Sequence, residues 1–126
     1  MKKNLALAIL FLALCQIGVC SVLFIPMDIK QTNHLKSYGL AFWVLERGLG
    51  VDWMLNYRGG SFVLPHSATI EKECKLRNIK YEVLADAQYN AIISQISKDD
   101  VNQDLMKLEK APKVAVYSPK NKQPWD

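Results

Sequence analysis

Two hydrophobic periodicities alternate along most of this chain, and their alternation limits the folds that it can adopt. Apolar runs typical of strands occur at residues 21–25, 51–56, 61–64, 79–84 and 113–117. Apolar residues recur at spacings of three and four in two stretches, Leu35, Tyr38, Phe42, Leu45 and Leu49 after Asn33, and Tyr89, Ile92, Ile93 and Ile96 after Asp86. Asn33, Ser67 and Asp86 are the expected caps of three helices. Because a period of two marks strands and a period of 3.6 marks helices, the chain mixes both elements.

Strands that alternate with helices favour right-handed β-α-β crossovers, which make neighbouring strands parallel. We therefore expect a three-layer α/β domain with a largely parallel sheet, Rossmann-like or flavodoxin-like, that is incomplete at its C-terminal end. The segments 51–56 and 61–64 can also pair as a hairpin across their glycine turn. Residues 98–110 are charged and fit either a loop or a short helix, and the turn after residue 117 ends at Asp126, a common residue at helix starts.

The first twenty residues have the composition of a secretory signal peptide. Lys2 and Lys3 precede an unbroken apolar run at residues 5–14, and more polar and small residues follow. This is the order of regions that a signal peptide requires. We expect cleavage before Ser21, which leaves residues 21–126 as an α/β domain in the periplasm, at the envelope or outside the cell. An uncleaved anchor is the alternative, although polar residues interrupt the stretch before the ~20 apolar residues of a spanning helix.

The charge and cysteine content of the exported part exclude several functions. The chain has sixteen basic and twelve acidic residues, and removal of Lys2 and Lys3 leaves a balance of +2. The basic residues form no stripe with aromatics, which argues against a nucleic-acid partner. Only Cys74 remains after cleavage, so an intramolecular disulfide is not possible, and we expect a packed thiol in a helix. A lipid anchor on Cys20 is disfavoured because Val19 precedes it.

Polar residues gather after two predicted strands, where ligands bind in open parallel sheets. The first loop offers donors near a helix N-terminus to an anion, and in the second loop Arg58 can hold a carboxylate or phosphate while its glycines let backbone amides approach a ligand. A solvated loop with an ordinary helix cap and a plain hairpin turn are the alternatives. The candidate residues for a small polar or anionic ligand are Asp28, Gln31, Asn33, His34, Lys36, Asn56, Arg58, Gly59, Gly60 and Ser61.

No complete motif for catalysis, nucleotide binding or metal binding occurs in the sequence. The Gly59-Gly60 pair lacks the residues of a Walker loop or a dinucleotide fingerprint, and there is no Gly-x-Ser-x-Gly elbow. His34 and His66 are the only histidines, and no cysteine pair accompanies them, so a zinc site is not expected. The sequence thus identifies no catalytic residue, cofactor or metal.

Three stretches carry a resemblance to a known family: IPMDIKQTNHLKSYGLAFWVLERG at 25–48, LNYRGGSFVLP at 55–65 and KVAVYSPKNKQPWD at 113–126. They resemble the N-terminal region of exported bacterial proteins named asparagine synthetase B. The resemblance implies an amidotransferase-like α/β fold and a C-terminal remainder of the same protein. The family name implies glutamine-dependent amide transfer to aspartate, but the N-terminal Cys-Gly-Ile and the Ser-Gly-Gly-x-Asp-Ser pattern of such synthetases are missing here. A non-catalytic binding module for a small polar ligand is the alternative function.

Overall fold

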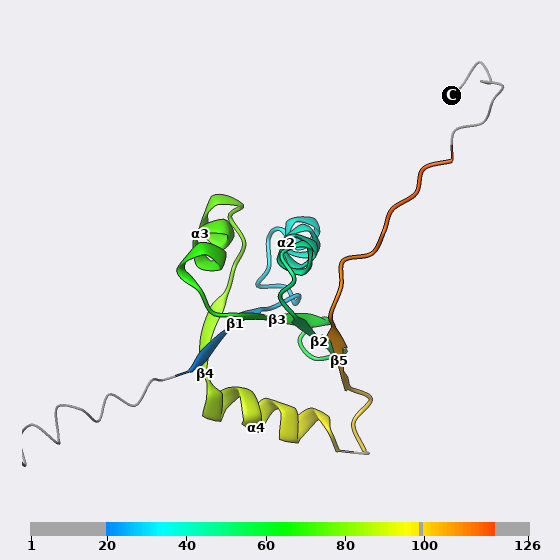
Figure 1. The fold of residues 1–126 in the computed structure, drawn as a ribbon. Helices are drawn as coiled ribbons and strands as arrows, with labels where there is room; N and C mark the ends of the chain where they lie inside the picture. The colour runs from blue at the N-terminus through cyan, green and yellow to red at the C-terminus, as the bar shows by residue number, and fades with distance from the viewer. Residues whose placement is uncertain (1–19, 99, 118–126) are drawn as a thin grey trace, which may run out of the picture.

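The protein forms one five-stranded sheet with helices on both faces (Figure 1). The structure is a computed structural model that describes residues 20–98 and 100–117. Within these ranges the elements are β1 (Ser21–Ile25), α2 (His34–Glu46), β2 (Val51–Leu55), β3 (Ser61–Pro65), α3 (Ala68–Leu76), β4 (Glu82–Ala85), α4 (Asp86–Ile96) and β5 (Asp104–Leu108).

The sheet is antiparallel throughout, so the expected parallel sheet of the Rossmann-like or flavodoxin-like kind is wrong. The strand order is β4-β1-β3-β2-β5, and each of the four neighbouring pairs is antiparallel. The register places Leu23 opposite Leu64 between β1 and β3, and Trp53 opposite Phe62 between β2 and β3. The central strand β3 therefore pairs with β1 along one edge and with β2 along the other.

The hairpin between β2 and β3 explains why the crossovers did not produce a parallel sheet. Because β1 and β2 are both antiparallel to β3, the helix α2 joins two strands that run in the same direction but are not neighbours. The helix α3 likewise joins β3 and β4 with β1 between them. This is the split β-α-β arrangement of ferredoxin-like domains, here extended by α4 and β5. The hydrophobic pattern predicted the two helical crossovers. It did not predict that another strand would lie between the two strands that each crossover joins.

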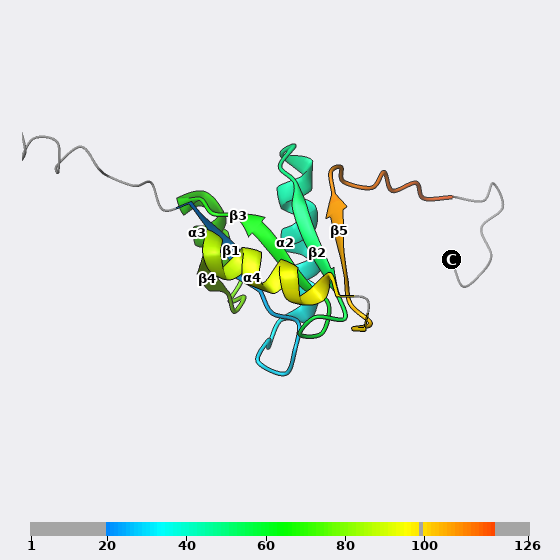
Figure 2. The same ribbon diagram turned by 90° about the horizontal axis from the view of Figure 1, so that it is seen from below.

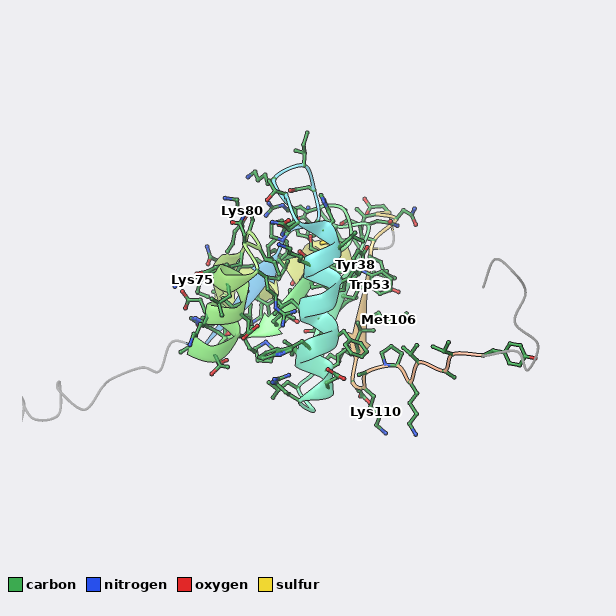
Figure 3. The ribbon with its side chains drawn as sticks, turned by 90° about the horizontal axis from the view of Figure 1, so that it is seen from above. Tyr38, Trp53, Lys75, Lys80, Met106 and Lys110 are labelled. Atoms are coloured by element: carbon green, nitrogen blue, oxygen red, sulfur yellow. The ribbon has the colours of Figure 1, made fainter. Side chains whose placement is uncertain are left out.

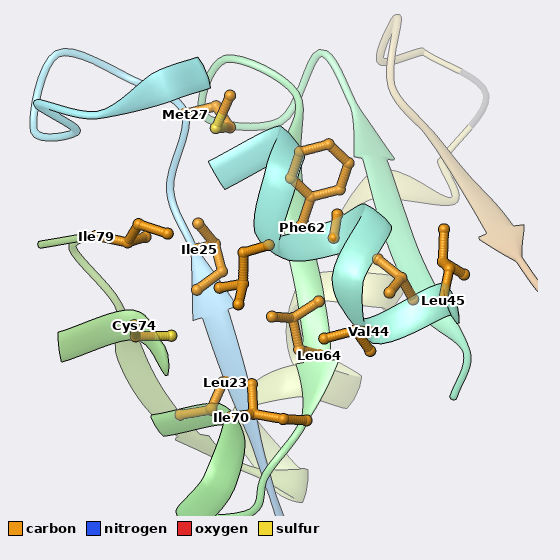
Figure 4. Packing of buried hydrophobic residues seen from close by; sticks show 13 residues of the cluster. Leu23, Ile25, Met27, Val44, Leu45, Phe62, Leu64, Ile70, Cys74 and Ile79 are labelled. Carbon is orange, nitrogen blue, oxygen red and sulfur yellow. The ribbon is translucent and has the colours of Figure 1, made fainter. Parts of the chain in front are cut away.

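The larger core lies between the sheet and the helices α2 and α3 (Figure 4). Leu23 and Ile25 of β1, Leu64 of β3 and Leu40 of α2 are at most 1% exposed there. Cys74 of α3 is also buried, and burial raises the pKa of its thiol to about 11, so it packs as a small apolar residue.

The helix α4 covers the opposite face alone and crosses beneath the sheet from the β4 edge toward β5 (Figure 2). Its contacts form a smaller core with Phe24, Met54 and Val63, and only Ile96 of the helix is fully buried. The predicted stripe of Tyr89, Ile92, Ile93 and Ile96 thus lies on the correct face but is mostly half-buried.

Several local predictions were wrong at the C-terminal end of the described chain. Within residues 98–110, predicted as a loop or a short helix, residues 104–108 instead form the strand β5 along the free edge of β2. Residues 113–117, predicted as a strand, have no partner strand among the described residues. The fourth strand begins at Glu82 rather than at residue 79.

The helix starts were predicted with mixed success. The Ser67 hydroxyl accepts a hydrogen bond from Ile70 N and caps α3 as expected. Asn33 precedes α2, but its side chain donates to Asn78 O instead of capping the helix. Ala85 rather than Asp86 occupies the cap position of α4.

Some predictions fall on residues that the structure does not describe. The expected signal peptide lies outside the described residues apart from Cys20, and the turn before Asp126 lies outside them as well. Among the helices of residues 20–98 and 100–117, none combines the length and apolar character needed to cross a membrane.

Candidate functional site

The two loops predicted to hold a ligand meet in the structure. Because β1 and β3 are antiparallel neighbours, the end of β1 lies beside the turn that precedes β3. Met27 N donates to Arg58 O at 3.1 Å, and the Arg58 guanidinium donates to Asp28 at 2.8 Å. The two candidate loops therefore lie together, although the sheet that positions them is antiparallel rather than parallel.

The charge of Arg58 is already balanced within this cluster. Its Nε donates to Asp28 Oδ2, its Nη1 lies 3.0 Å from Glu82 Oε1, and its guanidinium lies over the Phe24 ring at 5.0 Å. The hydrogen bond from Arg58 lowers the pKa of Asp28. One nitrogen, Arg58 Nη2, is buried without a hydrogen-bond partner in the described part of the chain. Two carboxylates and one guanidinium give a net charge of −1, which opposes the binding of an anion.

Gln31 has a structural position. It is 3% exposed, and its Nε2 donates to Pro26 O at 3.2 Å and to Lys80 O at 3.1 Å. Its Oε1 accepts from the backbone amides of Lys80 and Asn33. The side chain thus joins the loop after β1 to the loop before β4, and its amide has no free group for a ligand.

The other candidates of the first loop either bond to backbone carbonyls or lie on the exposed side of α2. His34 Nε2 is 3.1 Å from Met27 O, to which it donates, and Asn33 donates to Asn78 O at 2.6 Å. Lys36 is exposed on α2. A shallow hollow is lined by residues 32–36, but the polar groups of this loop face backbone partners.

The second loop is a tight turn whose polar groups hold the backbone. Asn56 has a φ of 58° and donates to Asn102 O at 3.0 Å, and buried Ser61 donates to the carbonyls of Tyr57 and Arg58. Gly59 adopts a φ of 83°, and a Cβ there would overlap the carbonyl of Met27. The carbonyl of Gly60 accepts a hydrogen bond from the Trp53 indole at 3.2 Å. The glycines therefore allow the two loops to pack, rather than a ligand to approach.

The structure contains a second feature that the sequence did not reveal, an apolar cleft between α2 and β5. The cleft has a volume of about 370 Å³ and is lined by Tyr38, Ala41, Phe42, Leu45, Trp53, Phe62, Leu108 and Pro112. Figure 3 shows Tyr38, Trp53 and Met106 along one flank of α2. We call this set, together with Met106, the α2 cleft.

Aromatic contacts shape the floor of the α2 cleft. The Trp53 ring stacks on Phe62 with a centroid distance of 6.1 Å, and Tyr38 meets Phe62 edge to face at 5.4 Å. The polar end of Trp53 is satisfied by Gly60 O, so the indole presents an apolar ring to the cleft. Tyr38 is 50% exposed and Met106, opposite Trp53 in the sheet, is 46% exposed.

An excess of apolar residues on α2 is the sequence signal from which this cleft could have been found. The predicted stripe contained Leu35, Tyr38, Phe42, Leu45 and Leu49, whereas the helix buries Ser37, Leu40, Ala41, Val44 and Leu45. The helix is therefore apolar over a wider arc than the core covers. Its uncovered flank forms one wall of the cleft.

The fold and the cleft define a class of protein: an extended split β-α-β domain with an open apolar surface. Among its described residues, no group of three His, Cys, Asp or Glu side chains is placed to hold a metal ion. In comparisons with known proteins, no family model, no curated protein and no solved structure matches the chain.

Proposed function

We propose that this chain is the N-terminal docking module of an exported protein of the family named asparagine synthetase B. In this proposal the α2 cleft binds the part of the protein that follows the module. The observation that carries the proposal is the cleft itself, because aromatic and aliphatic side chains gathered in an exposed hollow are typical of interaction surfaces.

The path of the chain supports an intramolecular partner. Pro112 lines the cleft, so the polypeptide leaves the module at the rim of this surface. Val114, Val116 and Tyr117 follow directly and are 79%, 88% and 88% exposed. Val114 and Val116 alternate as in a strand, and with Tyr117 they extend the exposed apolar surface where the chain leaves the module. A unit tethered at residue 112 has a high effective concentration beside the cleft, so modest contacts are enough to hold it.

The resemblance of residues 25–48, 55–65 and 113–126 supports the family and the export in this proposal. Amide transfer is not assigned to any residue of this chain, because its sequence lacks the motifs of that chemistry. The module contributes a binding surface, and any synthetase chemistry belongs to the remainder.

A site for a small polar ligand in the two loops stays a prediction with less support. Arg58 is paired with two carboxylates, and Gln31 and His34 are bonded to the backbone. A ligand would have to displace these contacts before it bound.

A nicking experiment on the exported protein, purified from the cells that produce it, tests the docking proposal. Lys110 and Lys113 are exposed in a segment without helix or strand, so limited trypsin treatment should cut there. We expect the nicked wild-type fragments to co-elute in size-exclusion chromatography. With Met106→Asp the fragments should separate, because burying an unpaired carboxylate costs several kcal/mol and weakens the contact by roughly 100-fold or more.

Val83→Asp is the matched control. Val83 lies on β4 at the other edge of the sheet and is 49% exposed, close to the 46% of Met106. Its fragments should stay associated after nicking. Separation of the wild-type fragments, or equal separation in the two variants, would contradict the proposal, as would a purified protein with no folded part after residue 113.

A further inference from the structure

A serine, a histidine and a glutamate form a chain of hydrogen bonds away from the α2 cleft. Ser21 Oγ lies 2.6 Å from His66 Nδ1, and His66 Nε2 lies 3.4 Å from Glu71 Oε2. Antiparallel pairing brings them together, because Val22 at the start of β1 lies opposite Pro65 at the end of β3. The helix α3 begins at Ala68, shortly after His66, and Glu71 lies in its first turn.

The surroundings of Glu71 keep its carboxylate ionised. Hydrogen bonds from Lys75, Tyr81 and His66 lower the pKa of Glu71 to about 2. An ionised Glu71 accepts a hydrogen bond from the Nε2–H group of His66. In this tautomer Nδ1 carries no proton and faces the Ser21 hydroxyl. A nucleophile, a base within hydrogen-bond reach and a group that orients the base are the parts that activate a serine.

A cavity lies at the same end of the sheet, mainly on the face that α4 covers, whereas alternation along β1 places Ser21 on the face of Leu23 and Ile25, toward α3. The volume of the cavity is about 570 Å³, and Ser21, His66, Val22, Asp52, Tyr89 and Lys107 are among its lining residues. Tyr89 donates a hydrogen bond to Asp52, and burial raises the pKa of its phenol. Ser21 is itself partly exposed at the start of β1, so a small acyl compound can reach its hydroxyl from solvent.

We propose that Ser21 is an activated nucleophile that takes the acyl group of a small activated ester, with His66 as its base and Glu71 as a positioning residue. The Ser21 Oγ–carbon bond forms as the bond from the acyl carbon to the leaving oxygen breaks. The hydroxyl proton passes to His66 Nδ1 and then to the leaving alkoxide, so the products are acylated Ser21 and an alcohol. This activity is independent of the docking function.

Acetylation by p-nitrophenyl acetate, followed by peptide mass spectrometry, tests this proposal. Ser94 serves as an internal reference because it is an exposed serine whose hydroxyl donates to Asn90 O. The acetyl group counted is the ester that neutral hydroxylamine removes, because an acetylated amine keeps its group. We expect this ester to form at residue 21 roughly 100-fold faster than at Ser94, as general-base assistance typically provides. His66→Gln should reduce it to the rate of Ser94, and Ser21→Ala should abolish it at residue 21.

The Glu71→Gln variant separates this role from a merely structural one. Its rate at residue 21 should fall while its rate at Ser94 stays unchanged, because His66 loses the carboxylate that orients its imidazole. Circular dichroism of each variant checks its fold, and the wild-type comparison of Ser21 with Ser94 needs no variant. Equal acetylation of these two serines would overturn the proposal, as would an unchanged rate in folded His66→Gln.

Discussion

Gly59→Ala should destabilise the domain by more than about 4 kcal/mol, a loss that urea unfolding followed by circular dichroism measures directly. The φ of 83° at Gly59 costs an alanine about 1 to 2 kcal/mol. The added Cβ would also overlap the Met27 carbonyl oxygen and lie 2.6 Å from the carbonyl carbon. Both neighbours are backbone atoms, so relief of the overlap must part the two loops.

Gly48→Ala is the control for the conformational part of this effect. Gly48 has a φ of 73° after α2, but a Cβ there meets no atom within 4 Å. We expect a loss of about 1 kcal/mol, as for other left-handed glycines. Similar losses for the two variants would show that the loops do not pack as described.

Gln31→Met should cost about 3 kcal/mol, although the side chains have similar size. The substitution removes four hydrogen bonds and leaves the backbone groups of Pro26 and Lys80 without the side-chain partner that they have in a buried place. Each buried polar group without a partner costs about 1 to 3 kcal/mol, and water can satisfy part of this demand. The midpoint of urea unfolding measures the loss.

Lys36→Met provides the comparison for Gln31, because Lys36 belongs to the same predicted site but is exposed. Its stability should change by at most about 0.5 kcal/mol. A Gln31→Met variant as stable as Lys36→Met would restore Gln31 as a candidate ligand residue rather than a structural one.

The sequence predicted most elements of this fold but not their pairing. Hydrophobic period and capping chemistry are local, so they located β1, α2, β2, β3 and α3 to within a few residues. Strand order depends on contacts between distant segments. The turn at Gly59 and Gly60 made a β2–β3 hairpin plausible, but nothing local indicated that β3 would lie between β1 and β2.

A ligand site in the two candidate loops stays a prediction, and the arrangement of the loops was predicted only in part. The loops of Asp28 and Arg58 do meet, because both follow or precede strands that pair at the centre of the sheet. The sequence did not show that Glu82, 24 residues after Arg58, would provide a second carboxylate. The α2 cleft was missed because a helical stripe predicts which residues are apolar, not how much of the stripe the fold covers.

Cysteine labelling of the full-length protein tests the proposed docking most directly. Met106→Cys and Val83→Cys introduce thiols at positions of similar exposure, and Cys74 is buried with a pKa of about 11, which keeps it unreactive. In the protein purified from producing cells, we expect a maleimide to label Cys at position 83 readily and at position 106 at least about tenfold more slowly. Equal labelling of the two positions would show that the α2 cleft is open in the native protein and would contradict the docking function.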